Sequence, residues 1–158
     1  MGPAVNPSPT GPDPLPADDP AAVTASFVHA IAWGEHTTVW ELLSATGRSV
    51  ALAVAQANGL DRVAASRIRD RLANPIELED FLAQLLGGLR HDLRSVDIGE
   101  LRLGRCEPAP AGDTAVVELL VPSLLPGTGP WPAGSVVLSD DGSGTWRVDR
   151  LEPILAGP

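Results

Sequence analysis

The 158-residue chain has the length of one ordinary domain, and its 44% hydrophobic and 20% charged residues are typical of a globular protein. Its net charge is −9, and because it contains no lysine, all of its basic groups are arginines. Affinity for nucleic acids comes mainly from cations that neutralise phosphates. We therefore expect no nucleic-acid partner.

Cysteine usage and hydropathy favour an intracellular protein. Cys106 is the single cysteine, so no internal disulfide can form. The first residues lack the basic and apolar regions of a secretory signal, and no apolar stretch approaches the roughly 18 residues that a membrane helix needs. These features predict a cytoplasmic location and no membrane partner.

The sequence suggests no metal or cofactor site. His29, His36 and His91 share no metal-ligand spacing with one another or with Cys106. We expect solvated surface histidines and a half-buried structural cysteine. The alternative for Cys106 is a nucleophile whose partners are distant in the sequence.

Residues 1–19 form a proline-rich segment, with prolines at positions 3, 7, 9, 12, 14 and 16. Proline fixes φ and removes a backbone donor, so this segment favours extended conformations over helix or sheet. We predict a disordered tail over residues 1–19 and a single domain over residues 20–155.

Helix start and stop signals follow the tail. Asp19-Pro20 is an N-cap followed by proline at the first helical position, and Gly34 ends the first helix. Similar signals predict helices over residues 38–47, 49–57 and 61–72, and a further helix that begins at Asn74-Pro75.

The clearest element is the helix that follows Pro75. Its apolar residues recur at i, i+3, i+4, i+7, i+8 and i+11, which defines one face of a helix. They are Leu78, Phe81, Leu82, Leu85, Leu86 and Leu89. We expect this face to be buried against the strands that come later in the chain.

After residue 95 the apolar period changes from 3.6 to 2, which indicates β-strands. The alternation predicts strands over residues 96–103, with a bulge at Gly99, and 115–121, followed by two strands around Val136–Leu138 and Trp146–Val148. Helices followed by a meander predict an α+β fold with the N-terminal helices packed on one face of a curved antiparallel sheet of four or more strands.

This pattern resembles the NTF2-like (SnoaL-like) superfamily. The resemblance is carried by the first helix through Phe27 and Ile31, by the helix at residues 38–43, and by the closing strand at residues 144–149. It implies a cone of helices over a curved sheet with a pocket between them. Residues 48–94 are longer than such domains usually have there, which implies a helical insertion.

The resemblance implies no catalytic residues. Some members of the superfamily are isomerases, cyclases, dehydratases or epoxide hydrolases, and others only bind ligands or proteins. The catalytic members that use a tyrosine beside acidic groups have no counterpart here, because the chain contains no tyrosine. Likeness of fold alone does not establish a reaction.

Two carboxylates are candidates for acid–base chemistry. Asp92 projects onto the apolar stripe of the helix at 78–89 when 100° is counted per residue, and a carboxylate desolvated there would have a raised pKa. The alternative is that the helix ends earlier and Asp92 is solvated. Glu118 interrupts an apolar strand, and it marks either the outer face of the sheet or a lone acid in a cavity.

Residues 122–132 form an unusually apolar connection that contains Leu124, Leu125, Trp131 and four prolines. It caps a pocket, forms a partner interface, or folds back over an edge of the core. Trp40 and Phe81 are the other residues that we expect to contact a ligand or partner.

Four arginines fall close together at positions 62, 67, 69 and 71. They either receive an anionic ligand or an acidic partner, or form an exposed helix face that nearby carboxylates balance.

Together these observations favour a non-catalytic domain that binds a small apolar molecule or a protein partner. The first alternative is a cofactor-independent isomerase, cyclase or dehydratase acting in the cone pocket. The second is an accessory protein that forms a homodimer through its sheet, which predicts a large exposed apolar sheet face.

Overall fold

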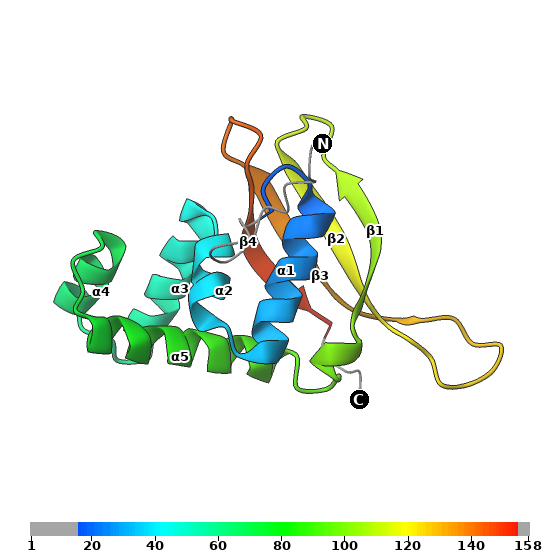
Figure 1. Ribbon diagram of the computed structural model, residues 1–158, viewed down its shortest axis with the longest axis horizontal. Helices are drawn as coiled ribbons and strands as arrows, with labels where there is room; N and C mark the ends of the chain where they lie inside the picture. Colours follow the sequence, from blue (N-terminus) through cyan, green and yellow to red (C-terminus); the bar gives the residue numbers. More distant parts are fainter. Residues whose placement is uncertain (1–15, 155–158) are drawn as a thin grey trace, which may run out of the picture.

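The computed structural model describes residues 16–154, in which five α-helices precede a four-stranded antiparallel sheet (Figure 1). This arrangement confirms the predicted α+β class. The helices are α1 (Pro20–Trp33), α2 (His36–Leu42), α3 (Ala45–Ala57), α4 (Arg62–Arg69) and α5 (Pro75–Asp92). The short 3-10 helix η1 (Ile98–Glu100) leads to strands β1 (Arg102–Pro108), β2 (Thr114–Val121), β3 (Trp131–Asp140) and β4 (Trp146–Pro153).

The polar residues that the sequence marks as helix starts act as N-caps. The side chain of Asp19 accepts a hydrogen bond from the backbone N–H of Ala21 at 3.1 Å. Asp61 caps α4 in the same manner, and Asn74 caps α5. Each cap satisfies a backbone donor that has no partner within the helix.

The boundary between α2 and α3 differs from the prediction. The sequence predicts that the second helix ends near Gly47, but α2 ends at Leu42 and Ser44 caps α3 by accepting from the Gly47 N–H at 3.0 Å. Gly47 lies inside α3 because the helix passes very close to β4. A Cβ on Gly47 would lie 2.5 Å from the carbonyl oxygen of Val148.

Gly47→Ala should therefore destabilise the protein by about 1–3 kcal/mol, because the atoms that the methyl group meets are backbone atoms that cannot turn away. Gly87→Ala is the matched control, since its Cβ would meet nothing within 4 Å. Gly87 is a solvent-exposed residue in the middle of α5, so alanine at this position should stabilise the helix by up to about 1 kcal/mol. Chemical denaturation of both variants measures the difference, and equal effects would contradict the close approach of α3 to β4.

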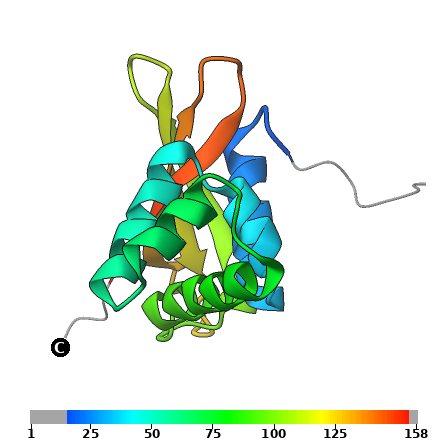
Figure 2. The same cartoon turned by 90° about the vertical axis from the view of Figure 1, so that its left-hand side faces the viewer.

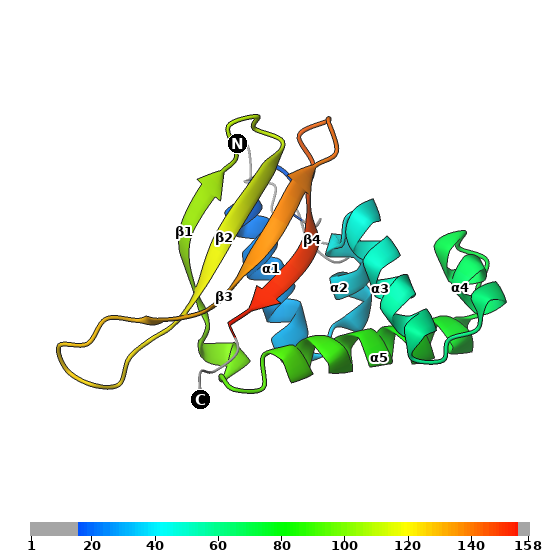
Figure 3. The ribbon, with the colours of Figure 1, turned by 180° about the vertical axis from the view of Figure 1, so that it is seen from behind.

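The sheet has the strand order β1-β2-β3-β4, with every neighbouring pair antiparallel. Ala115, Val117 and Leu119 of β2 are buried, whereas Val116 and Glu118 between them are exposed. The predicted alternation of β2 is thus confirmed. Figure 3 shows the other face of the sheet, which no helix covers.

The main core lies between α1 and the inner face of the sheet. Phe27 and Ile31 of α1 are at most 1% exposed, and Val117, Val136 and Val148 opposite them are fully buried. The side chains of α1 thus fill the face of the sheet on which the resemblance implies a pocket. The grooves described below lie beside this layer.

The leucine-rich face of α5 is partly buried, with Phe81, Leu82 and Leu86 buried and the other three residues half-buried, and its main neighbours are helices and not the strands. α5 packs under α1, α2 and α3 (Figure 2). Phe81 and Leu82 form a second cluster with Leu52 of α3 and Ile68 of α4. The expected packing against the strands is limited to the part of the face around Leu86, which joins the main core, because α2 and α3 stand between most of α5 and the sheet.

The first strand begins later than predicted. Residues 98–100 form η1, in which the side chain of Asp97 accepts from the Gly99 N–H at 3.0 Å. This short turn replaces the predicted strand and its bulge at Gly99. The irregularity of β1 instead lies between Leu103 and Cys106.

The segment before α1 contacts β4. The Trp146 N–H donates to the carbonyl oxygen of Ala17 at 2.7 Å, and Arg147 donates to that of Pro16 at 3.0 Å. Residues 1–15 of the predicted tail and residues 155–158 lie outside the described residues. Between residues 16 and 154, no helix combines the length and the apolar character that crossing a membrane requires.

Candidate functional site

The segment that joins β2 and β3 projects away from the body of the molecule (Figures 1 and 3). We call residues 122–131 the β2–β3 arm. Leu124 is 97% exposed, Leu125 is 65% exposed and Trp131 is 59% exposed. The hypothesis that these side chains fold back over the core is therefore wrong.

The arm has local structure of its own. Leu125, Pro126, Gly127 and Thr128 form a turn in which the Thr128 N–H donates to the Leu125 carbonyl oxygen at 3.2 Å. Gly127 has φ 79°, which a type II turn requires at its third position after proline. Trp131, predicted to lie in the loop, is the first residue of β3 and pairs with Val121. The apolar side chains are thus presented by a hairpin with a constrained tip.

A groove runs between α3, α5 and the edge of β4, with a volume of about 370 Å³. This α3–α5 groove is lined by Val50 and Val54 of α3 and by Leu85 and Leu89 of α5, with Phe81 below them. Val50 and Val54 are about half exposed. Its size and apolar lining match those of small-ligand sites.

Asp92 lies at the rim of the α3–α5 groove but is exposed. The hypothesis that it is desolvated on the leucine stripe is therefore wrong. Asp92 is the last residue of α5, and the chain leaves the helix at Leu93, whose side chain is 1% exposed. Asp92 does lie beside Leu85 and Leu89, as the helical projection predicts, but the groove there is open to solvent.

Glu118 lies on the outer face of the sheet, opposite Ser135 of β3, which in turn pairs with Glu152 of β4. The hypothesis that Glu118 is the acid of a cavity is therefore wrong. The neighbouring pair Arg150–Glu152, at 2.7 Å, also lies in this charged region. The outer face is not the large apolar surface that dimerisation through the sheet predicts.

His36 is half-buried and not the solvated histidine that the sequence predicts, whereas Cys106, His29 and His91 lie as predicted. His29 and His91 are exposed, and Cys106 is partly buried in β1. Burial, followed by the nearby charge of Asp19, raises the pKa of the Cys106 thiol. A raised pKa disfavours the thiolate that a nucleophile needs.

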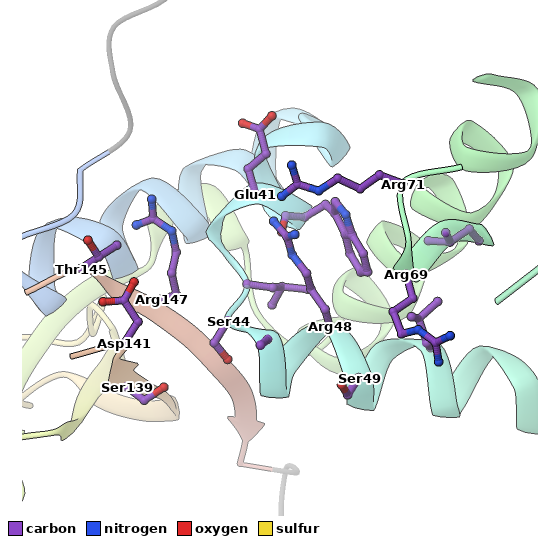
Figure 4. Close-up of a pocket in the computed structure, with 15 residues that line it drawn as sticks. Glu41, Ser44, Arg48, Ser49, Arg69, Arg71, Ser139, Asp141, Thr145 and Arg147 are labelled. Atoms are coloured by element: carbon purple, nitrogen blue, oxygen red, sulfur yellow. The ribbon is translucent and has the colours of Figure 1, made fainter. Parts of the chain in front are cut away.

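A second groove, of about 620 Å³, lies between α2, α3, the end of α4 and the β3–β4 hairpin (Figure 4). We call it the arginine groove, because it is lined by Arg48, Arg69, Arg71 and Arg147. Trp40 forms part of its wall and contacts the ring of Phe81 edge-on at 5.2 Å. Trp40 and Phe81 therefore lie between the two grooves.

The predicted arginine group separates in space. Arg69 and Arg71 line the arginine groove, but Arg67 pairs with Glu77 at 2.6 Å and Arg62 lies outside the groove. The hypothesis that these arginines form an exposed helix face is thus confirmed for Arg62 and Arg67. Arg48 and Arg147 were missed, because only the packing of α3 beside β4 brings them together.

Comparison with known proteins gives no relative from which to transfer a function: no family model, curated protein or solved structure matches the chain. The function is therefore argued from the surfaces described above.

Proposed function

We propose that the protein is a non-catalytic binding domain that docks onto a protein partner through its β2–β3 arm. The observation that carries this proposal is the exposure of Leu124, Leu125 and Trp131 on a hairpin that projects from the body. Large apolar side chains that folding leaves exposed together on one projecting segment indicate an interaction site.

The composition of the arm supports a protein as its occupant. Residues 122–131 contain no charged side chain, so docking the arm costs no desolvation of ions. Tryptophan is among the residues that contribute most to the affinity of protein interfaces. The turn at Pro126-Gly127 fixes the tip in advance, which lowers the entropy lost on binding.

A photoreactive amino acid at position 124 tests this proposal in the cell that makes the protein. We expect a crosslink to one defined protein, which mass spectrometry identifies either as a second copy of the chain or as another protein. Ala111 is the matched control, because it is an exposed residue at the tip of the β1–β2 hairpin. Absence of a defined product at position 124, or the same products from position 111, would contradict the proposal.

The α3–α5 groove supports a second candidate function, the binding of a small apolar molecule. Val54→Trp should fill the groove and displace such a ligand, whereas Val63→Trp, at a similarly exposed valine of α4 outside the groove, is the control. Native mass spectrometry of freshly isolated protein would detect the ligand on the parent and on V63W but not on V54W. A ligand-free parent would contradict this second function.

We further propose a cytoplasmic location and an architectural relation to NTF2-like domains. The order of helices before a meander supports the relation, and the helices α3, α4 and α5 occupy the part of the chain in which an insertion is expected. Asp92 and Glu118 lie on different surfaces, so these two carboxylates do not form an acid–base pair, which favours binding over catalysis.

A further inference from the structure

The arginine groove concentrates positive charge on a chain whose net charge is −9. Four of its lining residues are arginines, and only two, Glu41 and Asp141, are carboxylates. Among residues 16–154, the ion pairs involve other arginines. No carboxylate of these residues lies within ion-pairing distance of Arg48, Arg71 or Arg147. The groove thus gathers three cations that the described part of the chain leaves without ion-pair partners.

Arg48 is held in place within this groove. Its guanidinium lies over the ring of Trp40 at 5.0 Å, and its Nε donates to the Trp40 carbonyl oxygen at 3.1 Å. Neither of its terminal nitrogens donates to another described residue. Burial, and then the charge of Arg71, lower the pKa of Arg48, while Glu41 opposes this effect. An anion bound in the groove would offset both the cost of burying the Arg48 guanidinium and its repulsion by Arg71.

Arg71 adopts a backbone conformation that normally favours glycine. Its φ of 62° is the only positive φ of a non-glycine residue in the described chain. It follows the end of α4 in a Schellman motif, in which the Leu72 N–H donates to the Arg67 carbonyl oxygen at 2.7 Å. Glycine would satisfy this position with less strain. The turn itself therefore does not explain why this residue is an arginine.

The direction of the Arg71 side chain offers an explanation for the arginine. Figure 4 shows it reaching along the groove toward Glu41 and Arg48. In the described residues its guanidinium makes no hydrogen bond or ion pair. Arg71, whose backbone is in the left-handed region, thus places an unpaired guanidinium in a groove that already contains Arg48.

The β3–β4 hairpin supplies the opposite wall. Arg147 donates to the carbonyl oxygens of Trp146 and Pro16 at 2.8 and 3.0 Å, which fixes its position. Asp141 is engaged in its own turn, because its carboxylate accepts from both the N–H and the hydroxyl of Ser143. Asp141 forms no ion pair with Arg147, although the charge of Arg147 contributes, after the hydrogen bonds from Ser143 and Thr145, to the lowered pKa of Asp141. The hydroxyl groups of Ser49 and Thr145 also line the groove, whereas those of Ser44 and Ser139 donate to the carboxylate of Asp149 at 2.5 and 2.8 Å.

We propose that the arginine groove binds a small molecule through a phosphate or pyrophosphate group. Arg48, Arg71 and Arg147 hold the phosphate oxygens with charge-assisted hydrogen bonds, and the hydroxyls of Ser49 and Thr145 supply further donors. A multivalent phosphate matches three cations better than a single carboxylate does. Glu41 and Asp141 repel a longer acidic chain, so the groove favours a compact anion over an acidic segment of another protein.

Titration calorimetry with inorganic pyrophosphate tests the proposal on the full chain at constant ionic strength. Arg71→Gly and Arg48→Gln should each weaken binding by about tenfold or more, the effect of removing a hydrogen bond to a charged group. Arg62→Gln is the control, since it removes one charge from an exposed position outside the groove. It should change binding less than about twofold, because screening limits the effect of a distant surface charge.

The stability of the Arg71→Gly variant separates loss of the site from loss of the fold. Glycine relieves the left-handed conformation, so this variant should melt about 2–4 °C higher than the parent while binding pyrophosphate more weakly. Absence of pyrophosphate binding by the parent, or equal weakening by Arg62→Gln, would overturn the proposal. Tighter binding of citrate or of a polyglutamate peptide than of pyrophosphate would also overturn it.

Discussion

Val117→Asp should leave the protein largely unfolded. Val117 lies in the centre of β2, is fully buried, and faces α1 within the main core. An aspartate there would place a carboxylate among apolar side chains with no cationic partner. Such substitutions belong to the class that costs more than about 4 kcal/mol, a large part of the roughly 5–15 kcal/mol by which a typical domain is stable. Circular dichroism would show the loss of structure.

Val116→Asp is the matched control for this substitution. Val116 is the adjacent residue of the same strand but is 40% exposed on the outer face. The same change of chemistry should cost about 1 kcal/mol or less there, reflecting mainly the poor strand propensity of aspartate. Similar stability of the two variants would mean that the faces of β2 are assigned incorrectly.

Phe27→Ala should destabilise the protein by about 3–5 kcal/mol. Phe27 is the largest fully buried side chain and packs from α1 into the core. Its removal loses the transfer free energy of the ring and leaves a cavity that neighbouring strands cannot close. Urea denaturation would measure this loss as a lower midpoint with an unchanged slope.

Trp33→Ala serves as the control for the loss of an aromatic ring from α1. Trp33 is 73% exposed and contacts mainly His29, with ring centroids 5.9 Å apart. Its removal should change the free energy of unfolding by about 0.5 kcal/mol or less. A larger cost for Trp33 than for Phe27 would contradict the packing of α1 against the sheet.

The elements that sequence predicts well are those whose signals are local. Asp19, Asp61 and Asn74 cap helices with their own side chains, and the alternation of β2 reflects one covered and one uncovered face. The stripe on α5 shows that one face is buried but carries no information about what covers it. For that reason its burial was predicted correctly and its neighbours were not.

The candidate sites divide in the same way. Leu124, Leu125 and Trp131 stand out locally, because an apolar, proline-rich connection is unusual in any sequence. Arg48 and Arg147 are 99 positions apart and meet only because α3 packs beside β4. No spacing rule connects them. Asp92 lies beside Leu85 and Leu89 as the helical count predicts, but that count carries no information about whether another element covers this part of the stripe.

The measurement that tests the central claim most directly is the stability of a variant with Leu124, Leu125 and Trp131 all changed to serine. If the arm serves binding and not folding, the free energy of unfolding should stay within about 0.5 kcal/mol of the parent, while the protein that the crosslink from position 124 identifies no longer binds the variant. A loss of about 2 kcal/mol or more would show that these side chains help to hold the fold together, and would contradict their assignment as a docking surface.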